Sequence, residues 1–214
     1  GVYLSETSAS EFSNNTISGL EEAAGGTGGG AGTGGGTQQS YGVYLMPDSL
    51  DNAIDRTNTL EGDPIVYAWG IEGYVVEGLT ITAEGNPTNL GKIAVLNSSN
   101  AQVIDNVVSH FTGETGCSGK TKATGCPGYP GAGIRLDGCL NCAVSGNVVT
   151  DIIGGHGGTG FLFYSGGPGG IAAGIYLSQA PSCDIEGNTL SSAIGGTGGE
   201  GGLNGAGGTG GVAA

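Results

Sequence analysis

The sequence predicts an all-β solenoid, in which similar units of the chain stack along one axis. Three observations lead to this prediction: a pattern about 20 residues long recurs along the chain, each copy contains short runs of alternating apolar residues, and no stretch places apolar residues at helical spacing. Alternating apolar residues indicate strands with one buried face. Such units can bury that face only by stacking on one another, about 4.8 Å apart.

The repeated pattern is clearest between residues 174 and 196. Counted from Gly174, apolar residues lie at positions +1, +3, +11, +16 and +20, and Asn188 lies at +14. The copy at Ile65 is weaker and has Leu79 in the Asn position, and the copy at Gly42 aligns only over its first residues. We number the six copies as units one to six, and they begin at Gly1, Gly42, Ile65, Lys92, Gly133 and Gly174.

An asparagine lies at +14 in four of the units, as Asn15, Asn106, Asn147 and Asn188. A side chain repeated once per unit at a turn can hydrogen-bond to its copies above and below, so these residues predict a ladder within one turn. A Gly-apolar-Tyr-Leu start followed by Asn-x-apolar after a turn resembles the right-handed parallel β-helix of the pectate-lyase-like superfamily, which carries such a ladder. The resemblance covers the six units and implies a right-handed parallel β-helix of about six coils, but it implies little about function.

Four glycine-rich inserts follow the units at an equivalent point, so we expect them to project from one edge of the solenoid. Inserts one to four span residues 21–41, 112–132, 154–173 and 195–214. Insert four reads GGT GGE GGL NGA GGT GGV, and a period of three is typical of the polyproline II conformation. The inserts resemble the polyglycine II bundles of some phage-tip adhesins and of a glycine-rich antifreeze protein. Their composition alone would suggest disorder, but their near-constant length of 20 to 21 residues argues against it.

Five cysteines in a glycine-rich acidic chain favour an oxidising compartment. Cys117 and Cys126 lie on either side of one stretch of insert two and could close it. Cys142 and Cys183 both lie at +9 of adjacent units, so stacking would bring their Cα atoms within reach of a second disulfide. Cys139 is left over, and the alternative is a set of reduced thiols.

The charge of the chain excludes several partners. A net charge of −14 with only 5 Lys plus Arg argues against nucleic acid and anionic membranes, and no apolar stretch approaches the roughly 20 residues of a membrane span. The chain has no initiator Met or signal peptide, so we expect a mature chain or a piece of one, secreted or at the cell surface. No cofactor or metal site is predicted, because the one CxxC, from Cys139 to Cys142, lacks a second pair or a nearby His.

The outward position +2 carries aromatic residues in four units and predicts either plain cover for a sheet or a stripe that binds glycans. The candidate glycan-facing residues are Tyr3, Tyr44, Tyr67, Arg135 and Tyr176. The resemblance also raises the alternative of a polysaccharide lyase or epimerase, which would use clustered carboxylates and a basic residue. One Arg beside one Asp does not make such a cluster, so no catalytic residue is predicted.

These observations favour an extracellular structural protein that forms a fibre, sheath or cell-surface stalk. Neither end of the sequence carries the cap that solenoids usually have, and since 174 + 41 = 215, a seventh unit would begin one residue after Ala214. Copies could therefore stack head to tail through their terminal units, with possible polysaccharide partners, or the chain could be a slice of a longer solenoid. The sequence is also compatible with a surface or phage-tip adhesin and with an ice-binding protein that presents Thr27, Thr33, Thr159, Thr197 and Thr209.

Overall fold

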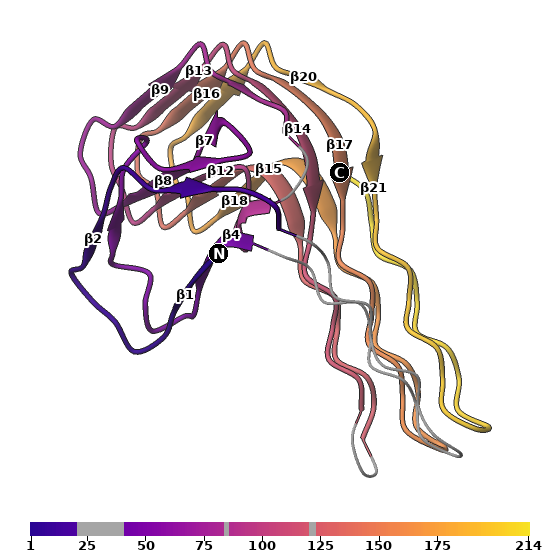
Figure 1. The fold of residues 1–214 in the computed structure, drawn as a ribbon. Coiled ribbons are helices and arrows are strands. Elements are labelled where there is room, and N and C mark those ends of the chain that lie inside the picture. Colours follow the sequence, from indigo (N-terminus) through magenta and orange to yellow (C-terminus); the bar gives the residue numbers. More distant parts are fainter. Residues whose placement is uncertain (21–40, 84–85, 120–122) are drawn as a thin grey trace.

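The computed structural model describes residues 1–20, 41–83, 86–119 and 123–214. The regular structure of these residues is entirely β, and most strands pair in parallel. The arrangement is compatible with a β-solenoid. Units three to six form one stack, and units one and two form a second, shorter one beside it (Figure 1).

Units three to six contribute one strand each to three parallel sheets. The first sheet contains β18 (Ala172–Ser178), β15 (Gly131–Asp137), β12 (Ile93–Leu96) and β8 (Val66–Trp69). The second contains β19 (Asp184–Glu186), β16 (Ala143–Ser145), β13 (Gln102–Ile104) and β9 (Val75–Glu77). The third contains β10 (Thr80–Ile81), β14 (Val107–Thr112), β17 (Val148–Ile153) and β20 (Thr189–Leu190), and β21 (Ala193–Ile194) also pairs with β17.

The register of these sheets reproduces the sequence repeat. Ile93 pairs with Ile134, and Ile134 with Ile175, which are steps of 134 − 93 = 41 and 175 − 134 = 41 residues. Because the sheets keep this register, the apolar residues at +1, +3, +11 and +16 form inward columns. Val95, Val103 and Val108 of unit four are fully buried in the resulting core.

Units one and two pair with each other rather than with unit three. Their strands are β1 (Val2–Leu4), β2 (Glu11–Phe12), β3 (Thr16–Ile17), β4 (Tyr41–Leu45), β5 (Ala53–Ile54), β6 (Thr59–Leu60) and β7 (Asp63–Pro64). A further strand, β11 (Asn86–Thr88), comes from the segment between the strands of units three and four. β4 pairs with β1 and β11, and β7 turns back antiparallel on β6. The single stack of six coils expected from the sequence is therefore replaced by stacks of two and four.

The outward residues of units three and four explain this break. Tyr67 and Ala94 at +2, and Leu96 at +4, are buried, and they pack against Leu4 and Leu45 of the first two units in a second apolar core. The equivalent outward residues of unit five are Arg135 and Asp137, which such a core could not accept without cost. The shorter stack thus covers only the end of the sheet whose outward face is apolar.

The described parts of inserts two, three and four leave the body side by side and run in the same direction (Figure 1). Inserts three and four each have an outgoing arm and a returning arm, with a reversal at the far end. Residues 21–40 of insert one lie outside the described residues, so the expectation for that insert stays a prediction.

Candidate functional site: the glycine-rich arms and the end of the stack

Asparagine side chains connect units three to six at the turn after the second sheet. Oδ1 of Asn147 accepts hydrogen bonds from the backbone N (3.0 Å) and Nδ2 (2.9 Å) of Asn106. Oδ1 of Asn188 accepts the same pair of bonds from Asn147, at 2.9 Å each. Asn15 lies in the other stack and bonds to Asn58 at 2.7 Å, so the four predicted residues form two ladders rather than one.

Asn58 was missed by the sequence analysis because unit two contains two one-residue insertions. The step between paired residues grows from 41 at Val2 and Val43 to 42 at Phe12 and Ile54, and to 43 at Ile17 and Leu60. A template of constant length therefore loses the register after the first strand of unit two. The sequence Asn58-Thr59-Leu60, which repeats the Asn-x-apolar pattern of Asn15-Thr16-Ile17, is the signal that could have restored it.

We expect Asn147→Ala to lower the free energy of unfolding by about 3 kcal/mol, because it leaves several buried backbone groups without partners. Asn147 is fully buried, and its Nδ2 also donates to the Val103 carbonyl at 2.8 Å. Urea denaturation measures the change. The matched control is Gln102→Ala on the exposed side of β13, which should change stability by less than about 0.5 kcal/mol. Equal effects of the two substitutions would contradict a stabilising ladder.

The five predicted glycan-facing residues do not form a continuous stripe. Tyr3 and Tyr44 stack with ring centroids 5.4 Å apart on the shorter stack. The Arg135 guanidinium lies over the Tyr176 ring at 5.2 Å and pairs with Asp137 at 3.0 Å. Tyr67 is only 2% exposed, and its hydroxyl donates to the Leu50 carbonyl. Tyr67 therefore does not belong to an open stripe, because the shorter stack covers it, but it lines a cavity where the two stacks meet.

The cysteines divide into one disulfide and three free thiols. Cys117 and Cys126 are joined, with their Cα atoms 4.9 Å apart, and close the stretch of insert two predicted from the sequence. The predicted Cys142–Cys183 disulfide is wrong, because both residues are free thiols. In-register side chains of stacked strands lie about 4.8 Å apart, whereas a disulfide needs Cβ atoms about 3.8 Å apart. Burial raises the pKa of both thiols and that of Cys139.

Alkylation under denaturing, non-reducing conditions should modify Cys139, Cys142 and Cys183 and spare Cys117 and Cys126. In the native protein the reaction should be slow at neutral pH, because the raised thiol pKa values leave little thiolate. Peptide mapping by mass spectrometry identifies the modified residues. A recovered peptide that links Cys142 to Cys183 would contradict the assignment of free thiols.

Backbone hydrogen bonds that repeat with a period of three residues hold the arms together. Within insert three, the N–H of Gly167 donates to the Gly158 carbonyl at 2.8 Å. Between inserts, Gly158 donates to Cys126 of insert two at 2.9 Å, and Gly157 donates to Thr197 of insert four at 2.8 Å. In the triplet Gly157-Gly158-Thr159, each glycine N–H therefore bonds to a different neighbouring insert, and the side chain of the third residue faces outward.

Glycine is required in the arms because their backbones approach closely. A Cβ atom on Gly158 would lie 1.9 Å from the Cys117 oxygen, and one on Gly167 would lie 1.9 Å from the Cys126 oxygen. The third residues carry the side chains. The Thr159 hydroxyl contacts Ser118 Oγ at 3.0 Å and the Thr197 hydroxyl contacts His156 Nδ1 at 2.7 Å, so two of the threonines considered for ice binding already have partners. Thr27 and Thr33 lie outside the described residues.

Gly158→Ala should destabilise the arms by about 1 to 3 kcal/mol, because the added methyl group overlaps the Cys117 carbonyl. The matched control is Gly207→Ala, where a Cβ meets no atom nearer than 3.7 Å. In dilute solution this control should be neutral or slightly stabilising. Hydrogen exchange of the arm amides measures the difference, and similar exchange in the two variants would argue against close backbone packing.

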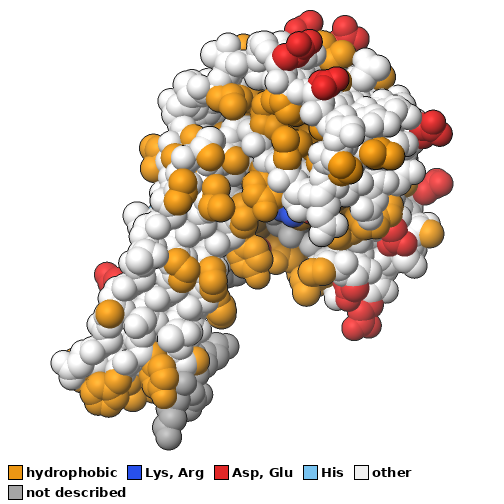
Figure 2. Space-filling view, turned by 180° about the vertical axis from the view of Figure 1, so that it is seen from behind, with side chains coloured by type: hydrophobic (Ala, Val, Ile, Leu, Met, Phe, Trp, Pro, Cys, Tyr) orange, Lys and Arg blue, Asp and Glu red, His pale blue; other side chains and the backbone are white. Residues whose placement is uncertain are grey.

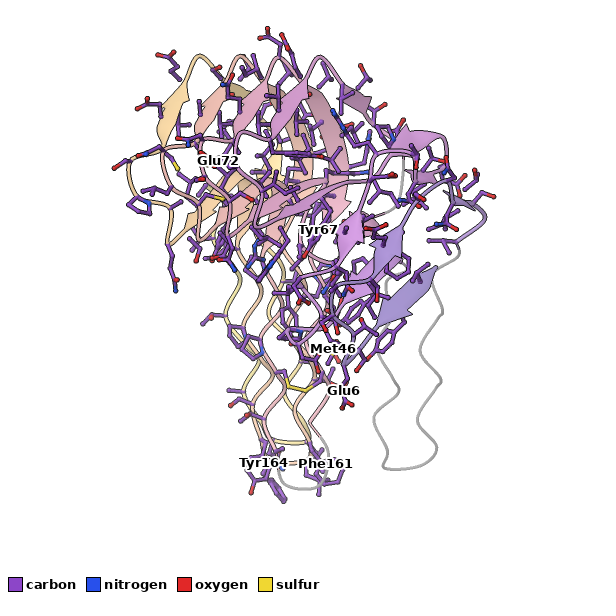
Figure 3. The ribbon with its side chains drawn as sticks, turned by 90° about the vertical axis from the view of Figure 1, so that its left-hand side faces the viewer. Glu6, Met46, Tyr67, Glu72, Phe161 and Tyr164 are labelled. Carbon is purple, nitrogen blue, oxygen red and sulfur yellow. A yellow bond between two sulfur atoms is a disulfide. The ribbon has the colours of Figure 1, made fainter. Side chains whose placement is uncertain are left out.

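The far end of the arms is apolar, and Figure 2 shows hydrophobic side chains gathered there. Phe163 and Leu203 are each 68% exposed, and Phe161 and Tyr164 lie at the same end (Figure 3). Most acidic side chains visible in Figure 2 lie on the body instead. The arms therefore form a nearly uncharged projection from an acidic body.

The face of unit six that points away from unit five has the same columns of apolar residues as the core, but here these residues are partly exposed. Leu177, Ile185 and Leu190 are 40 to 45% exposed, whereas their equivalents in unit five are fully buried. No acceptor among the described residues pairs with the backbone N–H of Asn188, although the same group of Asn147 bonds to Asn188. This face has the apolar columns and the donor that another unit would cover.

A cavity of about 390 Å³ lies where the two stacks meet. It is lined by Asp51, Asp55 and Arg56 from unit two and by Trp69 and Tyr74 from unit three. The Arg56 guanidinium lies over the Tyr74 ring at 5.7 Å, and burial raises the pKa of Tyr74. Aromatic rings next to charged and amide groups are the usual lining of a small-molecule site.

Lys92 is the one charged side chain fully buried among the described residues. Its Nζ donates to the Ala83 carbonyl at 2.7 Å, and burial lowers its pKa to about 8, against the opposing effect of Asp63. An amine with this pKa is a nucleophile near neutral pH, but a side chain that is 1% exposed has no access to a substrate. We therefore assign it no chemical role.

Comparisons of the chain with protein-family models, with curated proteins and with solved structures gave no match. The described ranges contain no group of three or more His, Cys, Asp or Glu residues placed to hold a metal ion. They also contain no helix that is long and apolar enough to cross a membrane.

Proposed function

We propose that the chain is an extracellular structural protein that builds a fibre, sheath or cell-surface stalk by continued stacking of its units. In this proposal units three to six belong to a right-handed parallel β-helix, and the arms are polyglycine II helices. The open face of unit six is the main observation that supports the proposal. Its apolar columns and the Asn188 N–H repeat the contacts that join units five and six.

The geometry of unit one supports a second copy as the partner of this face. Val2, Leu4 and Asn15 lie at the same template positions as Ile175, Leu177 and Asn188, with no insertion between them. In both ladders, the Asn of one unit donates to Oδ1 of the next. Asn188 could therefore donate to Oδ1 of Asn15 in another copy. Because the two contacting faces differ, the contact is heterologous and propagates into a filament.

The arms and the composition support a structural role. Hydrogen bonds at regular intervals tie each arm to its neighbours and stiffen one flank of the stack. The disulfide in insert two fits an oxidising, extracellular setting. A net charge of −14 keeps such a surface soluble away from the stacking contact.

A surface adhesin that binds glycans is the second candidate, and the cavity between the stacks favours it. A sugar ring could stack on Trp69 or Tyr74 while its hydroxyl groups bond to Asp51 or Arg56. Titration of neutral and amino-sugar oligosaccharides, followed by the fluorescence of Trp69, tests this candidate. Trp69 is the chain's one tryptophan, so any signal reports on this cavity.

Sedimentation velocity and electron microscopy of the purified chain test the structural proposal. The wild-type chain should form species far larger than 20.7 kDa and filaments. Leu190→Asp places a charge on the open face of unit six and should keep the chain monomeric, since Leu190 is 45% exposed there. The matched control is Leu140→Asp, because Leu140 is 47% exposed on the flank of unit five.

The control variant should assemble as the wild type does. A wild-type chain that remains a 20.7 kDa monomer at high concentration would contradict the proposal, as would equal assembly of all three proteins.

A further inference from the structure

Backbone hydrogen bonds between inserts three and four run in both directions, and one of the two sets of donors has open equivalents on insert four. In this set, four glycine N–H groups of insert three donate to carbonyls of insert four at 2.8 to 3.0 Å, from Gly157 to Thr197, Gly160 to Glu200, Gly166 to Ala206, and Gly169 to Thr209. One unit further along, the equivalent donors are Gly198, Gly201, Gly207 and Gly210. None of these four N–H groups has an acceptor among the described residues. Insert four therefore presents a regular row of amide donors on its outer side.

Two of these glycines are not explained by the packing of the described chain. A Cβ atom on Gly166 or Gly169 would lie 2.0 or 1.9 Å from a carbonyl oxygen of insert four. On Gly207 and Gly210, one unit later, a Cβ would meet no atom nearer than 3.7 and 3.8 Å. Neither residue adopts the left-handed conformation that favours glycine.

Glycine at these positions costs conformational entropy on folding and gains nothing within the described chain. The earlier insert shows what the same positions do when another arm lies next to them. They admit a neighbouring backbone at a distance that any side chain would block. The open donors and the two glycines thus point to the same missing neighbour.

We propose that the outer side of insert four binds a glycine-rich segment of the GGX type from a second copy of this chain, namely its insert one. The carbonyl oxygens of that segment would accept from Gly198, Gly201, Gly207 and Gly210. Residues 25–30 of insert one read GGTGGG, which matches the GGTGGE of residues 195–200. The inference rests on the proposed stacking, because unit one of the second copy brings its insert next to insert four.

Substitution of the two glycines tests this docking surface in the full chain. Gly207→Val and Gly210→Val should fold normally, because the space next to them is open, but should weaken assembly at least tenfold in sedimentation experiments. Thr209→Val is the matched control: it adds no volume, and the Thr209 side chain is exposed. We expect this control to assemble as the wild type does. If the glycine variants assemble as well as the wild type, the inference is wrong, while the stacking proposal stands.

A second measurement does not depend on assembly. A synthetic peptide with the sequence of residues 21–41 is added to the monomeric Leu190→Asp chain, and amide hydrogen exchange is followed by NMR. The peptide should slow exchange at Gly198, Gly201, Gly207 and Gly210 at least tenfold, and a peptide with valine at the glycine positions should not. Slowed exchange in a wild-type chain that never assembles would support the docking surface and refute the fibre. Unchanged exchange at all four glycines would overturn the inference.

Discussion

Backbone hydrogen bonding between units one strand spacing apart is the constraint on which the rest of the structure depends. Parallel in-register strands set a step of about 4.8 Å between units. The asparagine ladder and the glycine-rich arms repeat at the same step, because they are attached to the strands. The ladder of Asn106, Asn147 and Asn188 spans that step with side-chain amides. The arms span it with backbone amides, because each insert leaves its unit at the same position.

Glycine allows the arms to form backbone hydrogen bonds at this step. An arm with side chains at every position could not bring its N–H groups to the carbonyls of neighbouring arms, as the short Cβ distances at Gly158 and Gly167 show. The sheets therefore provide the register, and the glycines allow the arms to follow it. The third residue of each triplet, such as Thr197 or Thr209, is left free to vary and forms the outer surface of the projection.

The parts of the fold that repeat locally could be predicted from the sequence. Alternating apolar residues indicated the strands and their inward columns, and the spacing of Cys117 and Cys126 indicated a disulfide that the structure contains. The break after unit two could not be predicted from the same pattern, since it depends on outward residues. Tyr67, Ala94 and Leu96 are apolar at outward positions where unit five is charged. A pattern built on the inward residues does not include this difference.

Two errors in the candidate site have the same origin. Tyr67 was assigned to an open surface because its +2 position points outward, but a neighbouring stack covers it. Cys142 and Cys183 were paired because they share a register, but in-register side chains lie too far apart for a disulfide. In both cases the template gave the direction of the side chain correctly and omitted what lies next to it.

Amide hydrogen exchange along insert three tests the central claim most directly, because this insert lies between two others. The claim predicts a period of three: Gly155, Gly157 and Gly158 should exchange slowly, because each donates to a neighbouring arm, whereas His156 and Thr159 should exchange fast. Uniformly fast exchange from 154 to 171 would contradict the account, because it would mean that the arms are not held by their backbones.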